Sequence, residues 1–255
     1  MISFISCGGD AWVERRVDAP DHFRIRATYC RDRWCKPCQS ERSRHIAAVL
    51  LELIEPRATR MITLTLRHRD NGLKTQLDWL YRCFARLRRS KLWKTTQRGG
   101  AAFLECTWNP ATETWHPHLH VLAVGSYIPQ QALSKKWLSI TGDSNVVDVR
   151  WIRTPTHAAR YVTKYVTKNV SATVFRTPRA LEEAIVAMKG RRAALTFGSW
   201  RGVPLRRTEP DGEWERVESL SEFFARLDRG DEDAIACWPQ FATNGRAVWP
   251  YDHPP

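Results

Sequence analysis

The sequence contains no apolar run near the roughly 18 residues that a membrane-spanning helix requires, so we expect no transmembrane segment. The apolar stretch at its start is too short for a secretory signal and lacks a basic beginning. It has no internal repeat and no glycine-rich phosphate-binding loop. These absences favour a cytoplasmic protein without an ATPase of its own.

Acidic residues are scarce. The chain has 255 residues, with 27 Asp and Glu against 40 Lys and Arg, which gives a formal net charge of +13. This balance indicates a polyanionic partner, nucleic acid before anionic membrane. Hydrophobic residues make up 43% of the chain, enough to bury a large core. The 12 Trp include candidates for stacking on unpaired bases, although Trp is more often found in a core.

Apolar periodicity predicts an α+β protein whose antiparallel sheet carries helices on one side. Strands are expected at residues 61–66, 101–108, 118–124, 145–151 and 192–197. Helices are expected at residues 42–55, 73–93, 129–138, 156–170 and 181–189. Residues 209–233 reverse the charge balance, with ten Asp and Glu against three Arg. An amphipathic helix there would either pack on the core as a solvated C-terminal helix or bind a regulatory partner.

Four of the seven cysteines lie near the start of the chain: Cys7, Cys30, Cys35 and Cys38. The last three have spacing close to that of a zinc knuckle, and Cys7, followed by two glycines, can supply a fourth thiolate. Four thiolates suit a closed, structural Zn²⁺ site. The alternative is a set of buried or free cysteines. An odd total with uneven spacing favours a reducing compartment and metal binding over a disulfide framework.

Two histidines, His118 and His120, share one face of a predicted strand. Paired imidazoles on a buried face need a partner, and a divalent metal ion is the commonest one. Glu105 lies in the preceding strand, where a short link predicts a hairpin that would bring it beside the histidines. Alternatively Glu105 faces outward to solvent. His116 is a secondary candidate because Pro117 interrupts the strand pattern.

A predicted helix repeats the pattern Tyr-x-x-Lys, at Tyr161 with Lys164 and at Tyr165 with Lys168. The two tyrosines fall within about 40° of each other on the helix surface, flanked by the lysines. A phenol is a weak nucleophile at neutral pH, and a neighbouring ammonium group favours the phenolate and neutralises a phosphate. The alternative is an amphipathic helix with two interfacial tyrosines.

Together these motifs resemble the HUH endonucleases, specifically the rolling-circle replication initiators of small plasmids and single-stranded DNA phages. The family's three motifs occur in order: the strand at residues 62–66, the pair His118 and His120, and the tyrosine helix. The cysteine-rich residues 30–38 and the stretch 189–198 also resemble plasmid initiators. The resemblance covers about residues 5–205 and implies the HUH fold, an RRM- or ferredoxin-like antiparallel sheet with packed helices.

The resemblance also implies a chemistry. His118 and His120, with Glu105 as third ligand, would hold Mg²⁺ or Mn²⁺ against the scissile phosphate of single-stranded origin DNA. Tyr161 or Tyr165 would attack, leaving a 5′-phosphotyrosyl enzyme and a 3′-OH that primes replication, and a second transfer would rejoin the strand. Lys164 and Lys168 would bind phosphate or orient the nucleophile. Strand separation would need a host helicase or DNA supercoiling.

The predicted division is a zinc-binding module (1–45), an HUH endonuclease domain (46–205) and an acidic helical extension (206–255). Three alternatives remain open at this point. A transposase or relaxase of the same superfamily shares the chemistry and differs in its DNA. A non-catalytic zinc-dependent repressor would bind origin DNA without forming a covalent adduct. A metal hydrolase would use water in place of either tyrosine.

Overall fold

The computed structural model describes residues 6–55, 58–67, 69, 71–154, 170–205 and 212–243. Internal contacts divide the chain into two compact units. We call residues 43–207 the core unit, and residues 1–42 together with 208–255 the terminal unit. Segments that precede and follow the core unit along the chain therefore fold together.

The core unit contains a five-stranded sheet in the order β6-β3-β5-β4-β7, in which all neighbours are antiparallel. Along the chain its elements are β3 (Thr59–Thr65), α2 (Leu73–Arg89), α3 (Lys91–Thr96), β4 (Gln97–Asn109), β5 (Thr114–Gly125), α4 (Gln130–Thr141) and β6 (Val147–Trp151). Beyond residue 169 follow α6 (Ala172–Arg176), α7 (Pro178–Met188) and β7 (Ala194–Gly198). The prediction of an α+β protein with an antiparallel sheet is confirmed.

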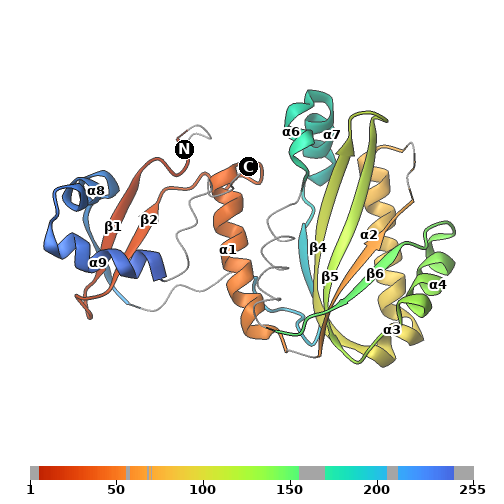
Figure 1. Cartoon of the computed structure of the whole chain (residues 1–255). Coiled ribbons are helices and arrows are strands. Elements are labelled where there is room, and N and C mark those ends of the chain that lie inside the picture. Colours follow the sequence, from red (N-terminus) through yellow and green to blue (C-terminus); the bar gives the residue numbers. More distant parts are fainter. Residues whose placement is uncertain are drawn as a thin grey trace. The chain divides into compact units, whose positions relative to one another are not determined.

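Helices cover both faces of this sheet (Figure 1). Helix α2 packs on one face, where the ring of Phe84 lies 5.7 Å from that of Phe197 on β7. On the other face α1 (Lys36–Leu53) contributes Ile46 and Leu50 to a buried cluster with Phe103 of β4. The prediction that all helices lie on one side of the sheet was therefore wrong for α1. Strands β4 and β5 carry buried apolar side chains on both faces, so each face can pack against a helix.

Two local patterns differ from the prediction. The helix expected at residues 73–93 is broken at Ser90, whose backbone is extended and whose hydroxyl accepts a hydrogen bond from the N–H of Trp93. Strand β5 runs through Pro117. Because β3 pairs with β5 only as far as His118, Pro117 has a strand on one side alone, an edge position that tolerates proline.

The terminal unit contains a three-stranded antiparallel sheet, in the order β2-β1-β8. Its strands are β1 (Ala11–Arg16), β2 (Phe23–Ala27) and β8 (Trp214–Ser219). Helices α8 (Leu220–Asp228) and α9 (Glu232–Thr243) pack on it around a core of Val13, Phe223, Ala234 and Phe241. The helix expected in the acidic segment is α8, and Ser219 begins it with a capping box to Glu222.

No helix within the described ranges combines the length and the apolar composition needed to cross a lipid bilayer.

Candidate metal centres

Neighbouring strands of the core unit bring Glu105, His118 and His120 together. His118 is the register partner of Glu105 across the β4–β5 hairpin. Nε2 of His120 lies 2.7 Å from Oε2 of Glu105, and both side chains are largely buried, at 6% and 19% exposure. The imidazoles of His118 and His120 are nearly parallel, with ring centroids 6.3 Å apart. Glu105 thus faces the histidines and not the solvent.

Two threonines of β3 hold the imidazoles from the other side. Thr63 Oγ1 lies 3.2 Å from Nδ1 of His120, and Thr65 Oγ1 lies 3.2 Å from Nδ1 of His118. If Nε2 of each ring binds a metal ion, Nδ1 carries the proton and donates to the threonine. Such outer hydrogen bonds fix the tautomer and the orientation of metal-binding histidines. Two imidazoles and one carboxylate are donor types that divalent cations bind, so these three residues stay a candidate metal site.

The threonines were part of the strand motif at residues 62–66, but no role was predicted for them. The signal was present in the alternation of Ile62, Thr63, Leu64 and Thr65, which places both hydroxyls on one strand face. Their contact with the histidines depends on the pairing of β3 with β5, and a hydroxyl beside a strand has too many possible partners for sequence alone to choose one.

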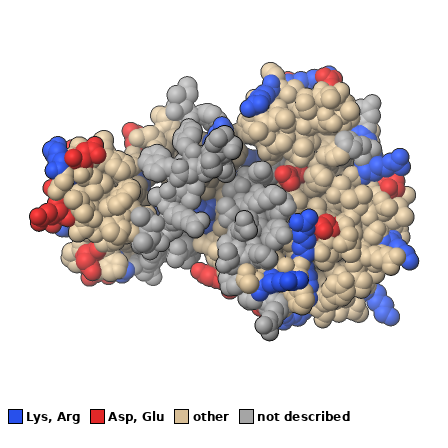
Figure 2. Space-filling model, in the orientation of Figure 1, with Lys and Arg blue, Asp and Glu red and all other residues tan. Residues whose placement is uncertain are grey.

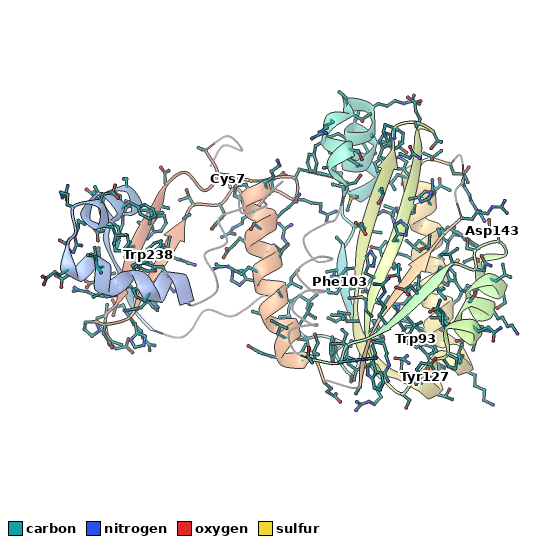
Figure 3. All side chains as sticks on the ribbon, viewed as in Figure 1. Cys7, Trp93, Phe103, Tyr127, Asp143 and Trp238 are labelled. Carbon is teal, nitrogen blue, oxygen red and sulfur yellow. The ribbon has the colours of Figure 1, made fainter. Side chains whose placement is uncertain are left out.

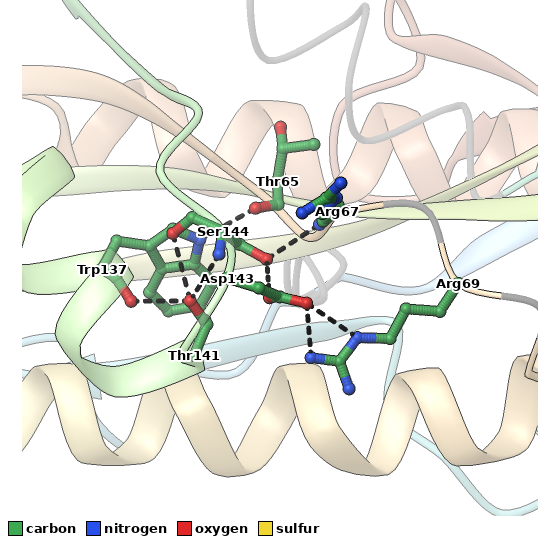
Figure 4. Close-up of polar contacts among 7 residues, drawn as sticks. All are labelled: Thr65, Arg67, Arg69, Trp137, Thr141, Asp143 and Ser144. Carbon is green, nitrogen blue, oxygen red and sulfur yellow. Dashed lines mark hydrogen bonds and ion pairs between the residues drawn. The ribbon is translucent and has the colours of Figure 1, made fainter.

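A polar network fixes the end of β3 that carries Thr65 (Figure 4). The indole N–H of Trp137 on α4 donates to the carbonyl of Thr65 at 2.8 Å. The Ser144 hydroxyl accepts from the N–H of Arg67 at 2.8 Å and donates to Asp143. Asp143 in turn pairs with Arg69 at 2.7 Å. The loop after α4 thus anchors the chain just beyond the threonine that contacts His118.

His116 continues the row of histidines, with its ring centroid 5.9 Å from that of His118. It lies on the same strand face as His118 and His120, two residues before His118 on β5. The remaining predicted site residues are Tyr161, Lys164, Tyr165 and Lys168, and all four lie outside the described residues. Their placement relative to the histidines stays a prediction.

The four N-terminal cysteines converge within the terminal unit. The sulfurs of Cys7, Cys30, Cys35 and Cys38 all lie within 4.8 Å of one another, the one group of three or more potential ligands that converges so closely in the described part of the chain. Cys7 and Cys38 have sulfurs 3.4 Å apart, and Cys30 and Cys38 have theirs 3.7 Å apart. With Zn–S bonds of about 2.3 Å, a tetrahedral site needs sulfurs about 3.8 Å apart.

Backbone hydrogen bonds favour the thiolate form of these cysteines, the form that binds a metal ion, whereas burial favours the neutral thiol. The N–H of Cys30 donates to the sulfur of Cys7, and the N–H of Arg31 to that of Cys38, each at 3.2 Å. Burial raises the pKa of Cys38 to about 12 and also raises that of Cys35. At Cys7 burial is outweighed by hydrogen bonds from Cys30 and the other thiols, which lower the pKa. The cluster can hold a metal ion such as zinc. Cys7 is labelled in Figure 3, as is Phe103 on β4.

The fold and the two candidate sites define a class of protein. Its members are α+β proteins that combine a cluster of four thiols with a strand carrying paired histidines. The family model described as "Replication protein" matches residues 22–238. The chain belongs to this replication protein family, which confirms the recognition made from the motifs.

A curated relative, "Protein rep" from Bacillus sp, is 35% identical over 126 residues. The match covers 46% of this chain and 41% of the relative, so the chain spans less than half of that protein's length. No solved structure matches the chain.

Proposed function

We propose that the protein initiates rolling-circle replication by nicking and rejoining single-stranded origin DNA. The observation that carries this proposal is the joined set of Glu105, His118 and His120, with Nδ1 of each imidazole held by a threonine. Membership of the replication protein family favours an initiator over a transposase, a relaxase or a repressor. Replication also implies DNA as the partner and the cytoplasm of a bacterial host as the location.

The proposed fold is that of the HUH endonucleases. Its support is the order β3-α2-β4-β5-α4-β6, a β-α-β-β-α-β arrangement with the short α3 inserted. The sheet order β6-β3-β5-β4 agrees with a ferredoxin-like split βαβ unit. On this proposal residues 46–205 are the endonuclease domain, residues 1–45 the zinc-binding module and residues 206–255 an acidic extension.

In the proposed reaction His118, His120 and Glu105 would hold Mg²⁺ or Mn²⁺, and a bound ion would supply Lewis-acid stabilisation of the scissile phosphate. The hydroxyl oxygen of Tyr161 or Tyr165 forms a bond to phosphorus and loses its proton. The bond from phosphorus to the 3′ oxygen breaks, and that oxygen takes up a proton. The products are a 5′-phosphotyrosyl enzyme and a free 3′-OH, so no water or nucleotide is consumed. Attack by a 3′-OH on the phosphotyrosine reverses the step and joins the strand.

The lysines have a supporting part in this scheme. Lys164 and Lys168 each follow a tyrosine by three residues and are proposed to bind phosphate or to orient the nucleophile. The reaction supplies no energy for unwinding. A host helicase or DNA supercoiling is therefore proposed to separate the strands.

The test is covalent capture. The protein is incubated with end-labelled single-stranded origin DNA and Mn²⁺, and an SDS-stable protein–DNA species is expected. Tyr161→Phe and Tyr165→Phe, made separately, assign the nucleophile, and Tyr127→Phe is the control because this exposed tyrosine lies outside the motif. DNA binding without an adduct would exclude nicking by tyrosine. Cleavage without an adduct would indicate a hydrolase that uses water.

A further inference from the structure

A pocket of about 450 Å³ lies in the core unit, between the end of α2, α3, the start of β4 and the end of β7. A second hollow of about 310 Å³ shares Arg89 with it and reaches α4. We call the cations that line the two hollows the basic surface: Arg86, Arg88, Arg89, Lys94, Arg98, Lys136 and Arg201. Figure 2 shows Lys and Arg outnumbering Asp and Glu on the visible side of this unit.

Few carboxylates oppose this charge. Residues 79–104 contain seven Lys and Arg and no Asp or Glu. Among the described residues, Arg98 of the basic surface forms an ion pair with Glu55 at 2.7 Å. The surface therefore carries a large uncompensated positive charge, as expected of a site for a polyanion.

Arg88 is the member of the basic surface that packs against aromatic rings of the core. Its guanidinium carbon lies 4.9 Å from the ring centroid of Phe84 and 5.4 Å from that of Phe197. Its Nε is buried and has no hydrogen-bond partner among the described residues. Burial, and then the charges of Arg201 and Arg89, lower the pKa of Arg88. A bound anion would supply both the missing acceptor and the missing counter-charge.

The aromatic residues of the pocket are not available to bases. Trp93 and Phe197 are each 3% exposed and pack on each other with ring centroids 6.0 Å apart. Single-stranded nucleic acids are bound largely through bases that stack on exposed rings. Charged side chains without such rings contact phosphates, the feature that a duplex presents outward.

We propose that the basic surface binds the backbone phosphates of double-stranded DNA. That this duplex flanks the single-stranded nick site rests on the proposed function. Arg98 and Glu105 are seven residues apart on β4, and at about 3.3 Å per residue they lie about 23 Å apart. The pocket lies on the α2 face and the histidines on the α1 face. A duplex on the basic surface would thus lie about 23 Å or more from the histidines, a distance equal to the length of about seven base pairs at about 3.4 Å each.

The test compares duplex and single-stranded DNA of the same sequence by fluorescence anisotropy across a salt series. The test variant is Arg89→Gln/Lys94→Gln/Arg201→Gln, which removes three exposed charges and leaves Arg88 in place. Each lost phosphate contact should lower the slope of log K against log salt by about 0.9, so a drop of about 2–3 is expected with the duplex. Duplex affinity should fall by at least about tenfold, and single-strand affinity should change far less.

The matched control is Lys74→Gln/Arg179→Gln/Lys189→Gln, which removes three exposed cations elsewhere in the same unit. Equal losses in the test and control variants would overturn the inference, as would equal losses with the two kinds of DNA. Unfolding midpoints of both variants confirm that they fold. This measurement needs no cleavage of DNA. A missing covalent adduct would therefore contradict the proposed function without contradicting duplex binding by the basic surface.

Discussion

Each candidate metal-binding histidine depends on one hydroxyl group of β3. Thr65→Val keeps the β-branched shape but removes the oxygen that lies 3.2 Å from Nδ1 of His118. We expect a 10–100-fold rise in the metal concentration needed for cleavage, roughly the usual cost of losing such an outer hydrogen bond. The free energy of unfolding should change by only about 1 kcal/mol. A titration of DNA cleavage with Mn²⁺ measures the first effect and urea unfolding the second.

Thr107→Val is the control for this prediction. Thr107 lies on β4, opposite His116 in the register and two register pairs beyond Glu105 and His118. Its substitution should leave the metal requirement unchanged within about twofold if only Nδ1 of His118 and His120 matters. A shift as large as that of Thr65→Val would mean that the hydroxyl contacts do not orient the metal ligands.

The juxtaposition of His118, His120 and Glu105 could be predicted from sequence because strand parity and a short hairpin both follow from local pattern. Parity gives the shared face of the histidines, and the hairpin gives the partner of Glu105. The doubt about His116 came from Pro117, a local rule that holds for central strands. That rule did not apply here because the pairing of β3 with β5 ends at His118, which leaves Pro117 with a strand on one side alone. The residues around Pro117 do not show where the neighbouring strand ends.

Helix α2 begins without a cap of its own, because Gly72 precedes it and has no side chain to accept a hydrogen bond. Glu183 of α7 supplies the cap instead. Its Oε1 accepts from the N–H of Leu73 at 2.6 Å, and its Oε2 accepts from the indole N–H of Trp115 at 2.8 Å. One carboxylate thus caps α2, satisfies a buried indole on β5 and places negative charge at a helix N-terminus.

Glu183→Ala should lower the free energy of unfolding by about 2 kcal/mol, since both donors lose their acceptor and the indole of Trp115 stays buried. Glu183→Gln should cost less, because one acceptor oxygen remains. Chemical denaturation of the purified variants measures both values. Glu182→Ala is the control, since Glu182 is the exposed neighbour on the same helix. Equal costs at the two positions would show that the cap contributes nothing.

The stability contributed by the contacts between the end of β3 and the loop after α4 is expected to depend on pH. Burial alone would raise the pKa of Asp143, but hydrogen bonds from Ser144 and Arg69 outweigh it and lower the pKa. A carboxyl group with a lowered folded pKa contributes stability above its unfolded pKa of about 3.9, and this contribution is lost as the pH falls through the folded value. Asp143→Asn should therefore cost about 0.5–1 kcal/mol at neutral pH.

The comparison of this variant with the unsubstituted protein at neutral and at strongly acidic pH tests the sign. The gap in the free energy of unfolding should close as Asp143 becomes protonated. Asp148→Asn removes a carboxylate from an exposed pair with Arg150 and should show little effect at either pH. A gap for Asp143→Asn that is independent of pH would mean that the charge of this residue is not what stabilises the loop.

The terminal unit joins a segment before the core unit to a segment after it, and no local pattern predicted this. Strand β8 lies about two hundred positions after its partner β1, as in the pair of Arg15 with Glu215. Glu213, Glu215 and Glu218 contributed to the acidic count of the segment, which indicated a solvated helix and hid the strand. Two of these acids have arginine partners within the unit, because Glu215 pairs with Arg15 of β1 and Glu218 pairs with Arg226 of α8.

The terminal unit has a small apolar core, the cluster around Phe223, and the four-cysteine site lies in the same unit. A core of this size rarely stabilises a fold alone, and small units commonly rely on a metal ion. We therefore expect about one zinc ion per chain, in line with a four-thiolate site. The core unit has its own larger cluster around Leu50 and Phe103 and should not need the metal.

Cys35→Ser/Cys38→Ser is expected to abolish zinc binding, measured by elemental analysis, and to lower the melting transition of the terminal unit, because metal binding and folding are coupled in such sites. A second, higher transition from the core unit should stay within a few degrees of its original position. Cys83→Ser in the core unit is the matched control and should keep the zinc. A zinc-free protein with an unchanged melting profile would instead assign the four thiols to packing, since a structural metal site cannot be emptied without loss of stability.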